Sequence, residues 1–342
     1  MLKVLGLEKV QPIQLEIPIQ IGPFKFLPLE ALDADVDTIF HIQVEHLHLL
    51  HVVDSWIGPQ TFSKLIETKW DLVPWPFQTM RELEVIAPSI AEKSDQLLPH
   101  EWIEQLQALK PKAIIPSSCQ FRFEEWSWLN QAFFPISYAS FELQIREVLP
   151  KAQVLRLNPG ETLLYSSEVW LKQGRLNWIQ PLGDQNADYP FDASIKPQAT
   201  SEIAQKFSPL TNEQSALVQA YCQFQIQNRW RSLRHDESPL FSASYHWRLK
   251  VYDHTGSVQD YQYEIKQNQI HVENLTEAPS WVTEIPAAKL YAALTQGESL
   301  TSLYIRVIPA KDIDPLEDPL IRCLYEGFTG SYQKAQLLKL GY

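Results

Sequence analysis

The chain has 342 residues, a formal net charge of −12 and a hydrophobic share of 45%. This length predicts two domains, and the negative charge excludes both a general nucleic-acid-binding surface and docking on anionic membranes, because each needs basic side chains. Gly is scarce, at 11 residues, which argues against a glycine-rich nucleotide-binding loop. Three widely spaced cysteines fit a reducing compartment. We see no signal peptide or membrane span, so we expect a cytoplasmic protein.

The first 180 residues begin with β-type patterns and continue with alternating strands and helices. Two apolar runs, 38–45 and 47–53, predict a hairpin that turns near Glu45 and His46. Residues 61–68 and 100–109 have helical spacing, and residues 69–75 and 113–116 are typical of buried strands. A helix at 137–149, a strand at 153–157 and a hairpin across Gln173 and Gly174 complete this part. We therefore predict an α/β domain over residues 1–180.

A segment rich in Gly, Pro and Asp, residues 181–211, is predicted to be a linker. After it, residues 213–232 have the pattern of one long helix. Strand patterns at 242–252, 259–266, 269–272 and 302–308 alternate with helical ones at 287–294, 318–326 and 332–340. Residues 212–342 are accordingly predicted to form a small α+β domain.

Polar side chains follow several of the predicted strands in the first domain. Asp54 ends the run 47–53, Gln78 follows the run 69–75, and Ser117 and Ser118 follow the run 113–116. Polar groups that follow neighbouring strands meet at one edge of an α/β sheet, where such proteins build their sites. We therefore take these residues as candidate site residues.

The order of these segments resembles a known family. The pattern of a strand with His51-x-x-Asp54-Ser55, the segment DLVPWPFQ at 71–78, LKPKAIIPSS at 109–118 and the turn NPGE at 158–161 is similar to the second half of the metallo-β-lactamase fold. The most similar branch contains ascorbate-6-phosphate lactonases and CMP-sialic-acid hydroxylases. The resemblance covers about residues 15–165. It implies a metallo-β-lactamase-like sandwich, complete or incomplete, and a role for Asp54 as a carboxylate that bridges two metal ions.

The chain departs from this family at most of the metal ligands. The family's His-x-His-x-Asp-His motif lies far upstream of the bridging aspartate, and only 53 residues precede Asp54. Residues 29–33 contain no histidine, and Ser117 and Ser118 stand where the last metal-binding histidine belongs. A catalytic zinc site needs about three protein ligands. The resemblance therefore implies a degenerate or truncated metal site.

Few residues near Asp54 could bind a metal, and each of them could instead have a purely structural role. His41, His46, His48 and His51, together with Asp54, could form a makeshift transition-metal site. In a strand, however, His46 and His48 would face one side and His51 the other, so packed histidines are the alternative. Asp54 could equally form the turn into the next helix.

A dense aromatic group surrounds the last candidate, Arg122. This group could line a ligand pocket or a partner surface, and packing in the core is the alternative. Ser117 and Ser118 could act as nucleophiles or ligand contacts, but no Gly-x-Ser-x-Gly motif surrounds them. We keep Gln78, Ser117, Ser118 and Arg122 as predicted ligand-binding residues.

We expect a binding or interaction protein of this fold without hydrolase activity of its own. The alternative is a metal-dependent hydrolase or oxygenase whose first-half ligands are missing from this sequence, because another chain supplies them or because that half was lost from the gene model. Zinc, iron or manganese would then be the metal; no cofactor is otherwise expected. Half a sandwich would expose a large apolar face, which soluble monomers rarely tolerate. A homo-oligomer or a partner chain is therefore expected to cover that face.

Overall fold

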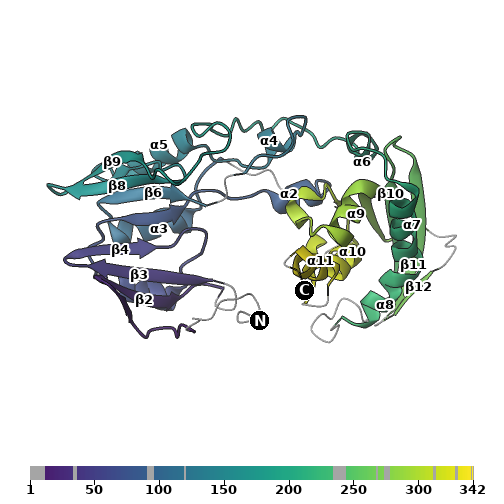
Figure 1. Ribbon diagram of the computed structural model, residues 1–342, viewed down its shortest axis with the longest axis horizontal. Coiled ribbons are helices and arrows are strands. Elements are labelled where there is room, and N and C mark those ends of the chain that lie inside the picture. The colour runs from purple at the N-terminus through teal and green to yellow at the C-terminus, as the bar shows by residue number, and fades with distance from the viewer. Residues whose placement is uncertain are drawn as a thin grey trace. The chain divides into compact units, whose positions relative to one another are not determined.

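The computed structural model describes residues 12–33, 37–90, 96–118, 121–233, 244–266, 269–272, 278–310, 313–327, 330–339 and 341. The chain forms two compact units. In Figure 1 the first is purple to teal, and the second is green to yellow apart from its blue helix at Glu82–Ile86. Unit 1 comprises Met1–Met80 and Ser94–Ala193, and unit 2 comprises Arg81–Lys93 and Ser194–Tyr342. The predicted linker is thus shared, since residues 181–193 pack with unit 1 and residues 194–211 with unit 2.

Unit 1 is built on one mixed sheet. Its antiparallel part consists of β1 (Ile19–Ile21), β2 (Phe24–Glu30), β3 (Thr38–Val44) and β4 (Leu47–His51). Its parallel part consists of β5 (Val73–Pro76), β6 (Ala113–Ser117) and β7 (Gln153–Val154). The Leu50 and Val52 amides donate to the carbonyls of Leu72 and Pro74, both at 3.1 Å, and so join β4 to β5 in parallel. The four strands β4 to β7 therefore point the same way.

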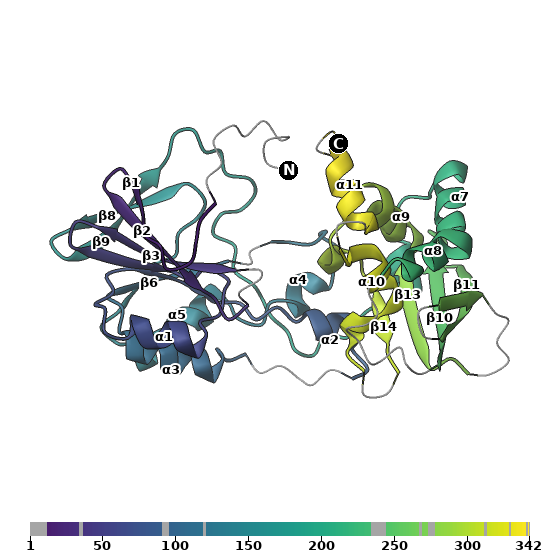
Figure 2. The same ribbon diagram turned by 90° about the horizontal axis from the view of Figure 1, so that it is seen from below.

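Helices cover one face of this sheet. They are α1 (Pro59–Leu65), α3 (His100–Leu109) and α5 (Tyr138–Val148), which lie together on one side in Figure 2, with the short α4 (Leu129–Ala132) elsewhere in the unit. The predicted helix 100–109 is confirmed, because its apolar positions recur at helical spacing and bury Trp102, Leu106 and Leu109. Trp70, Trp75 and other large side chains fill the layer between helices and sheet. Their burial is the main source of stability in unit 1.

The other face is covered only in part, by a hairpin of β8 (Glu161–Ser166) and β9 (Val169–Arg175). Trp170 packs against Leu72 and Ala113 there, and its ring N–H donates to the Asp71 carbonyl at 3.0 Å. The predicted turn at Gln173 and Gly174 is wrong. The chain turns at Ser167 and Glu168 instead, and both have positive φ angles, 52° and 64°, which a two-residue hairpin loop requires.

Unit 2 has a five-stranded sheet in the order β12-β11-β10-β13-β14. Its strands are β10 (Ser244–Tyr252), β11 (Val258–Lys266), β12 (Gln269–Val272), β13 (Trp281–Pro286) and β14 (Arg306–Ile308). Its helices are α2 (Glu82–Ile86), α6 (Thr200–Ala204), α7 (Asn212–Ala220), α8 (Ile226–Arg231), α9 (Ala287–Thr295), α10 (Pro319–Tyr325) and α11 (Ser331–Lys339). Short 3₁₀ turns lie at Leu300–Ser302 and Pro315–Glu317.

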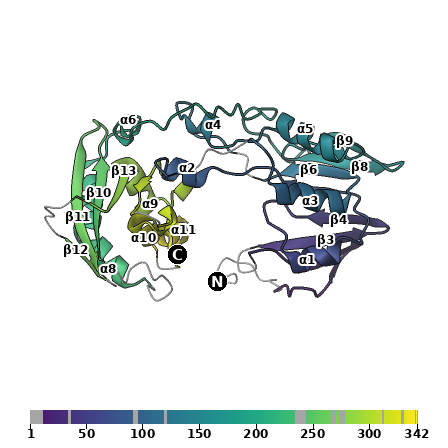
Figure 3. The ribbon, with the colours of Figure 1, turned by 180° about the vertical axis from the view of Figure 1, so that it is seen from behind.

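The core of unit 2 lies on one face of its sheet. There Trp247, Leu249 and Val251 of β10 pack against helical residues such as Trp230 and Leu290. Figure 3 shows α9, α10 and α11 gathered beside the strands. The opposite face is polar, because its outward side chains form ion pairs such as Lys250–Glu284 at 3.3 Å. Unit 2 is thus a two-layer α+β structure.

Three elements of unit 2 differ from the sequence-based prediction. The predicted long helix 213–232 is split by a π-helical turn, Tyr221–Gln225, between α7 and α8. Strand β13 is absent from the prediction, although Trp281, Thr283 and Ile285 alternate inward and the strand lies between β10 and β14. Helix α2 falls within the predicted first domain, yet its Ile86 belongs to the core of unit 2.

The two units together give a mixed α/β and α+β structure with several sheets. Within the described part of unit 1, the only layer opposite the helices is the β8–β9 hairpin, so a complete two-sheet sandwich is not seen there. None of the described helices is both long and apolar enough to cross a membrane.

Candidate functional site

The carboxyl ends of β4, β5 and β6 bring four of the predicted site residues, Asp54, Gln78, Ser117 and Ser118, to one edge of the unit 1 sheet. Because these strands are parallel, the segments that follow them emerge side by side. Two residues there have left-handed backbones although they are not glycine: Val53 at φ 58° and Ser118 at φ 78°. Such conformations are strained and are common near functional sites.

The three predicted metal-binding histidines lie in different environments. His46 is exposed in the β3–β4 turn. His48 points to the helix-covered side, where its Nδ1 lies 2.9 Å from Nε2 of His41. Burial, together with neighbouring His48 and Lys25, lowers the pKa of His41 to about 4. His41 is therefore neutral at pH 7, and its contact with His48 is one of packing within the fold.

His51 and Asp54 lie apart from that pair, at the end of β4. Burial lowers the pKa of His51, and the nearby Asp54 carboxylate opposes this shift. Asp54 is exposed in a turn, and the N-cap of α1 is Gly58 rather than Asp54. No group of three or more His, Cys, Asp or Glu side chains gathers among the described residues. The donor set at His51 and Asp54 thus falls short of the three ligands that a catalytic metal needs.

The predicted ligand contacts of β5 and β6 serve the fold itself. Gln78 is buried, and its amide pairs with both the N–H and the carbonyl of Ile136, so it holds two loops together. The Ser117 hydroxyl donates to the Ile115 carbonyl at 3.2 Å. Ser118 is half-buried and has a left-handed backbone. Its hydroxyl makes no hydrogen bond to a basic side chain among the described residues.

Arg122 lines a pocket of about 490 Å³ beyond the end of β7. Arg156, at the same pocket, donates to the carbonyls of Gln185 and Ala187 and lies 3.8 Å over the Tyr138 ring. Arg156 therefore holds the surrounding loop, whereas Arg122 is exposed. Arg122 thus lines this pocket. The other cationic residue of the lining is Arg156, whose guanidinium is already hydrogen-bonded to the loop.

The most distinctive surface of unit 1 is the face of β1 to β4 that the helices leave free and the β8–β9 hairpin covers only in part. Register places apolar side chains directly opposite one another in two cross-strand rows, which continue from strand to strand. One row is Ile19, Phe26, Ile42 and Leu49, and the other is Ile21, Phe24, Val44 and Leu47. We call these eight residues the open face.

The eight residues of the open face carry no charge, and the described part of unit 1 covers them only in part. Ile21 is 60% exposed and Phe24 is 41% exposed, and Phe26, Ile42 and Val44 are half-buried. Leu47 and Leu49 contact the small cluster under β8–β9. The sequence carries a signal for this face as alternation at 24–26 and 42–44, but alternation alone does not say which face a helix will cover.

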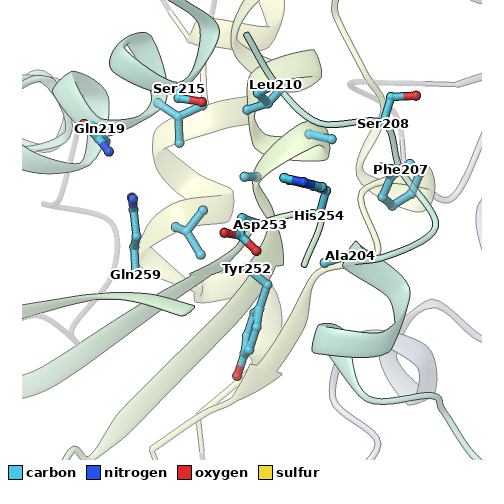
Figure 4. A pocket seen from close by; sticks show the side chains of 14 residues that line it. Ala204, Phe207, Ser208, Leu210, Ser215, Gln219, Tyr252, Asp253, His254 and Gln259 are labelled. Atoms are coloured by element: carbon cyan, nitrogen blue, oxygen red, sulfur yellow. The ribbon is translucent and has the colours of Figure 1, made fainter. Parts of the chain in front are cut away.

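Unit 2 contains a separate pocket of about 260 Å³ (Figure 4). It lies at the carboxyl ends of the parallel strands β10 and β13, beside α7 and the first residues of α9. Asp253 and His254 of the β10–β11 turn contribute to its lining. No motif or spacing in the sequence marks these residues.

Comparisons with known proteins do not assign the chain to a family. No protein-family model matches it, and no curated protein matches it. Among solved structures, the chain is similar to that of CmlA, a diiron beta-hydroxylase from Streptomyces venezuelae, and to that of a mutant of CmlA. In both cases the identity is 18%, the TM-score is 0.32, and the match covers 46% of this chain and 34% of that chain. A likeness at this level assigns neither a fold family nor an activity.

Proposed function

We propose that this protein is an interaction protein that associates through the open face of unit 1, with a second copy of the chain as the occupant. The observation that carries the proposal is the pair of uncharged cross-strand rows, which reach the surface at Ile21 and Phe24. A monomer rarely leaves such a surface in water.

The geometry of the open face favours a sheet as its occupant. Two sheets pack face to face about 10 Å apart, with the apolar side chains of both interdigitating. Because the rows are uncharged and run straight across four strands, two copies related by a two-fold axis can bury the same residues against each other. Full burial of a side chain such as Phe24 stabilises the complex by roughly 1.5–3 kcal/mol.

The test is the oligomeric state of the purified chain, measured by sedimentation velocity over a range of concentrations. We expect a dimer that the substitutions Ile21→Lys and Phe24→Lys each weaken at least tenfold, because a lysine would be buried without a partner. In the monomer these positions are 60% and 41% exposed, so the variants should remain folded.

Gln20→Lys is the matched control, because Gln20 neighbours Ile21 on β1 but points to the opposite face. Its dimer should have the dissociation constant of the unmodified chain. A chain that stays monomeric at every concentration, or a dimer that Ile21→Lys leaves intact, would show that the open face is not a self-association surface.

A metal-dependent hydrolase or oxygenase is the second candidate, and the position of His51 and Asp54 at one strand end favours it. It requires another chain to supply the remaining ligands. Elemental analysis of the purified protein separates the two proposals: zinc, iron or manganese bound one to one would support the second candidate, whereas we expect less than one-tenth of an equivalent, roughly, from a two-ligand site.

A further inference from the structure

The unit 2 pocket has an uneven distribution of charge. Asp253 is its only carboxylate, and no Lys or Arg is among the residues that line it. Asp253 Oδ1 accepts hydrogen bonds from the amides of Thr255 and Ser257, at 2.8 and 3.0 Å. Its other oxygen, Oδ2, has no hydrogen-bond partner among the described residues. The pocket therefore presents a carboxylate oxygen that is available to a ligand.

The rest of the lining combines polar side chains that have no hydrogen-bond partner in the described chain with apolar side chains. Ser215 and Gln219 of α7 line the pocket, and their side chains make no hydrogen bonds within the described chain. Val218 and Val251 are almost fully buried behind them. Figure 4 shows Asp253 and His254 in the middle of the lining, with Ser215, Gln219 and Gln259 on one side and Phe207 on the other.

We propose that this pocket binds a small primary amine. The ammonium group would donate to Asp253 Oδ2, with the Ser215 hydroxyl and the Gln219 carbonyl as neighbouring acceptors. The apolar body of the amine would lie against Val218 and Val251. An anion is disfavoured, because the Asp253 carboxylate would repel it and no Lys or Arg lines the pocket to pair with it.

The volume limits the size of the ligand. About 260 Å³ corresponds to roughly nine atoms of the size of a water molecule, at about 30 Å³ each. The pocket is thus smaller than the usual range for drug-sized ligands and suits an amine with a short chain or a single ring. Phenethylamine has this size and serves as the probe.

The experiment is a calorimetric titration of the full chain at about pH 7.5 with phenethylamine, 2-phenylethanol and phenylacetate. These molecules share the ring and differ in the charge of the head group. We expect phenethylamine to bind saturably and at least tenfold more tightly than the alcohol or the acid. Equal or tighter binding of phenylacetate, or no saturation by phenethylamine up to about 10 mM, would overturn the proposal.

Two variants test the assigned residues. Asp253→Asn keeps an oxygen for the Thr255 and Ser257 amides but removes the charge, and Ser215→Leu fills the pocket while leaving the charge in place. Each should weaken phenethylamine binding at least tenfold. Gln223→Leu is the matched control, because Gln223 is exposed in the turn that follows α7 and does not line the pocket.

Circular dichroism before each titration shows whether the variant remains folded. Should Ser215→Leu unfold, Asp253→Asn still decides the question. Binding by Asp253→Asn within twofold of the unmodified chain would contradict the amine site, whereas the open-face dimer would be unaffected by either result.

Discussion

Val53 concentrates backbone strain in a single residue of unit 1. It has φ 58°, and for a β-branched residue the left-handed conformation is unfavourable by about 1–2 kcal/mol. Asn tolerates this conformation, so Val53→Asn should raise the free energy of unfolding of unit 1 by about 1 kcal/mol. Urea unfolding followed by tryptophan fluorescence measures the change.

Val52→Asn is the comparison for that substitution. Val52 is 2% exposed and belongs to the core, so an amide there should lower the unfolding free energy instead. If Val53→Asn also lowered the unfolding free energy, the contacts of the Val53 side chain would outweigh the strain of its backbone.

Residue identity alone could not predict the roles of the candidate site residues. Asp54 and Gln78 both follow apolar strands, yet Asp54 is exposed in a turn while the Gln78 amide is engaged by Ile136, 58 positions away. The strand pattern correctly placed both side chains at one sheet edge. Whether a polar side chain is free depends on partners that are distant in sequence, and no local pattern encodes them.

At the level of elements, the β8–β9 hairpin carries unfavourable residues in its turn. Ser167 and Glu168 both have left-handed backbones, which Asn and Gly adopt far more readily. Replacing the pair by Asn-Gly should therefore slow amide hydrogen exchange in β8 and β9, as expected for a local gain of about 1 kcal/mol.

The same exchange experiment contains its own reference. Protection in β10 and β11 of unit 2 should not change, because the substituted turn belongs to unit 1. Faster exchange in β8 and β9 would mean that Glu168 makes contacts worth more than its backbone strain.

Elements with strong periodicity are predictable from the sequence, and those defined by tertiary packing are not. The helix 100–109 has four apolar positions on one side, and its bounds match the structure. The glycine at 174 favours a turn there, yet Gly174 lies inside β9, so the predicted hairpin is displaced. The π-helical turn within 213–232 escapes prediction, because one extra residue in a helical turn leaves almost no trace in the apolar pattern.

At the level of the whole molecule, the two units contain buried titratable groups with opposite effects on stability. In unit 1, burial lowers the pKa of His41 to about 4. The folded state then binds fewer protons than the unfolded state between about pH 4 and 6.5, so unit 1 loses stability as the pH falls through this range. We expect a loss of about 2 kcal/mol, because the partial exposure of the ring reduces the full effect.

In unit 2, Asp318 caps α10 and is fully buried, where it accepts hydrogen bonds from Trp281 and Thr283 and from two backbone amides. Burial raises the pKa of Asp318 to about 6, against these hydrogen bonds. The folded state therefore binds more protons than the unfolded state between about pH 4 and 6. The stabilising effect is fully present below about pH 4 and is lost as the pH rises through 6, by about 3 kcal/mol.

Acidification from about pH 6.5 to 4.5 should accordingly destabilise unit 1 relative to unit 2. Amide hydrogen exchange, converted to free energies at each pH, follows β3 and β4 for unit 1 and β10 and β13 for unit 2. The substitutions His41→Gln and Asp318→Asn each remove one titration, so each should flatten the pH dependence in its own unit only. Equal slopes in both units, or a slope in unit 2 that Asp318→Asn leaves unchanged, would show that other groups set the response to acid.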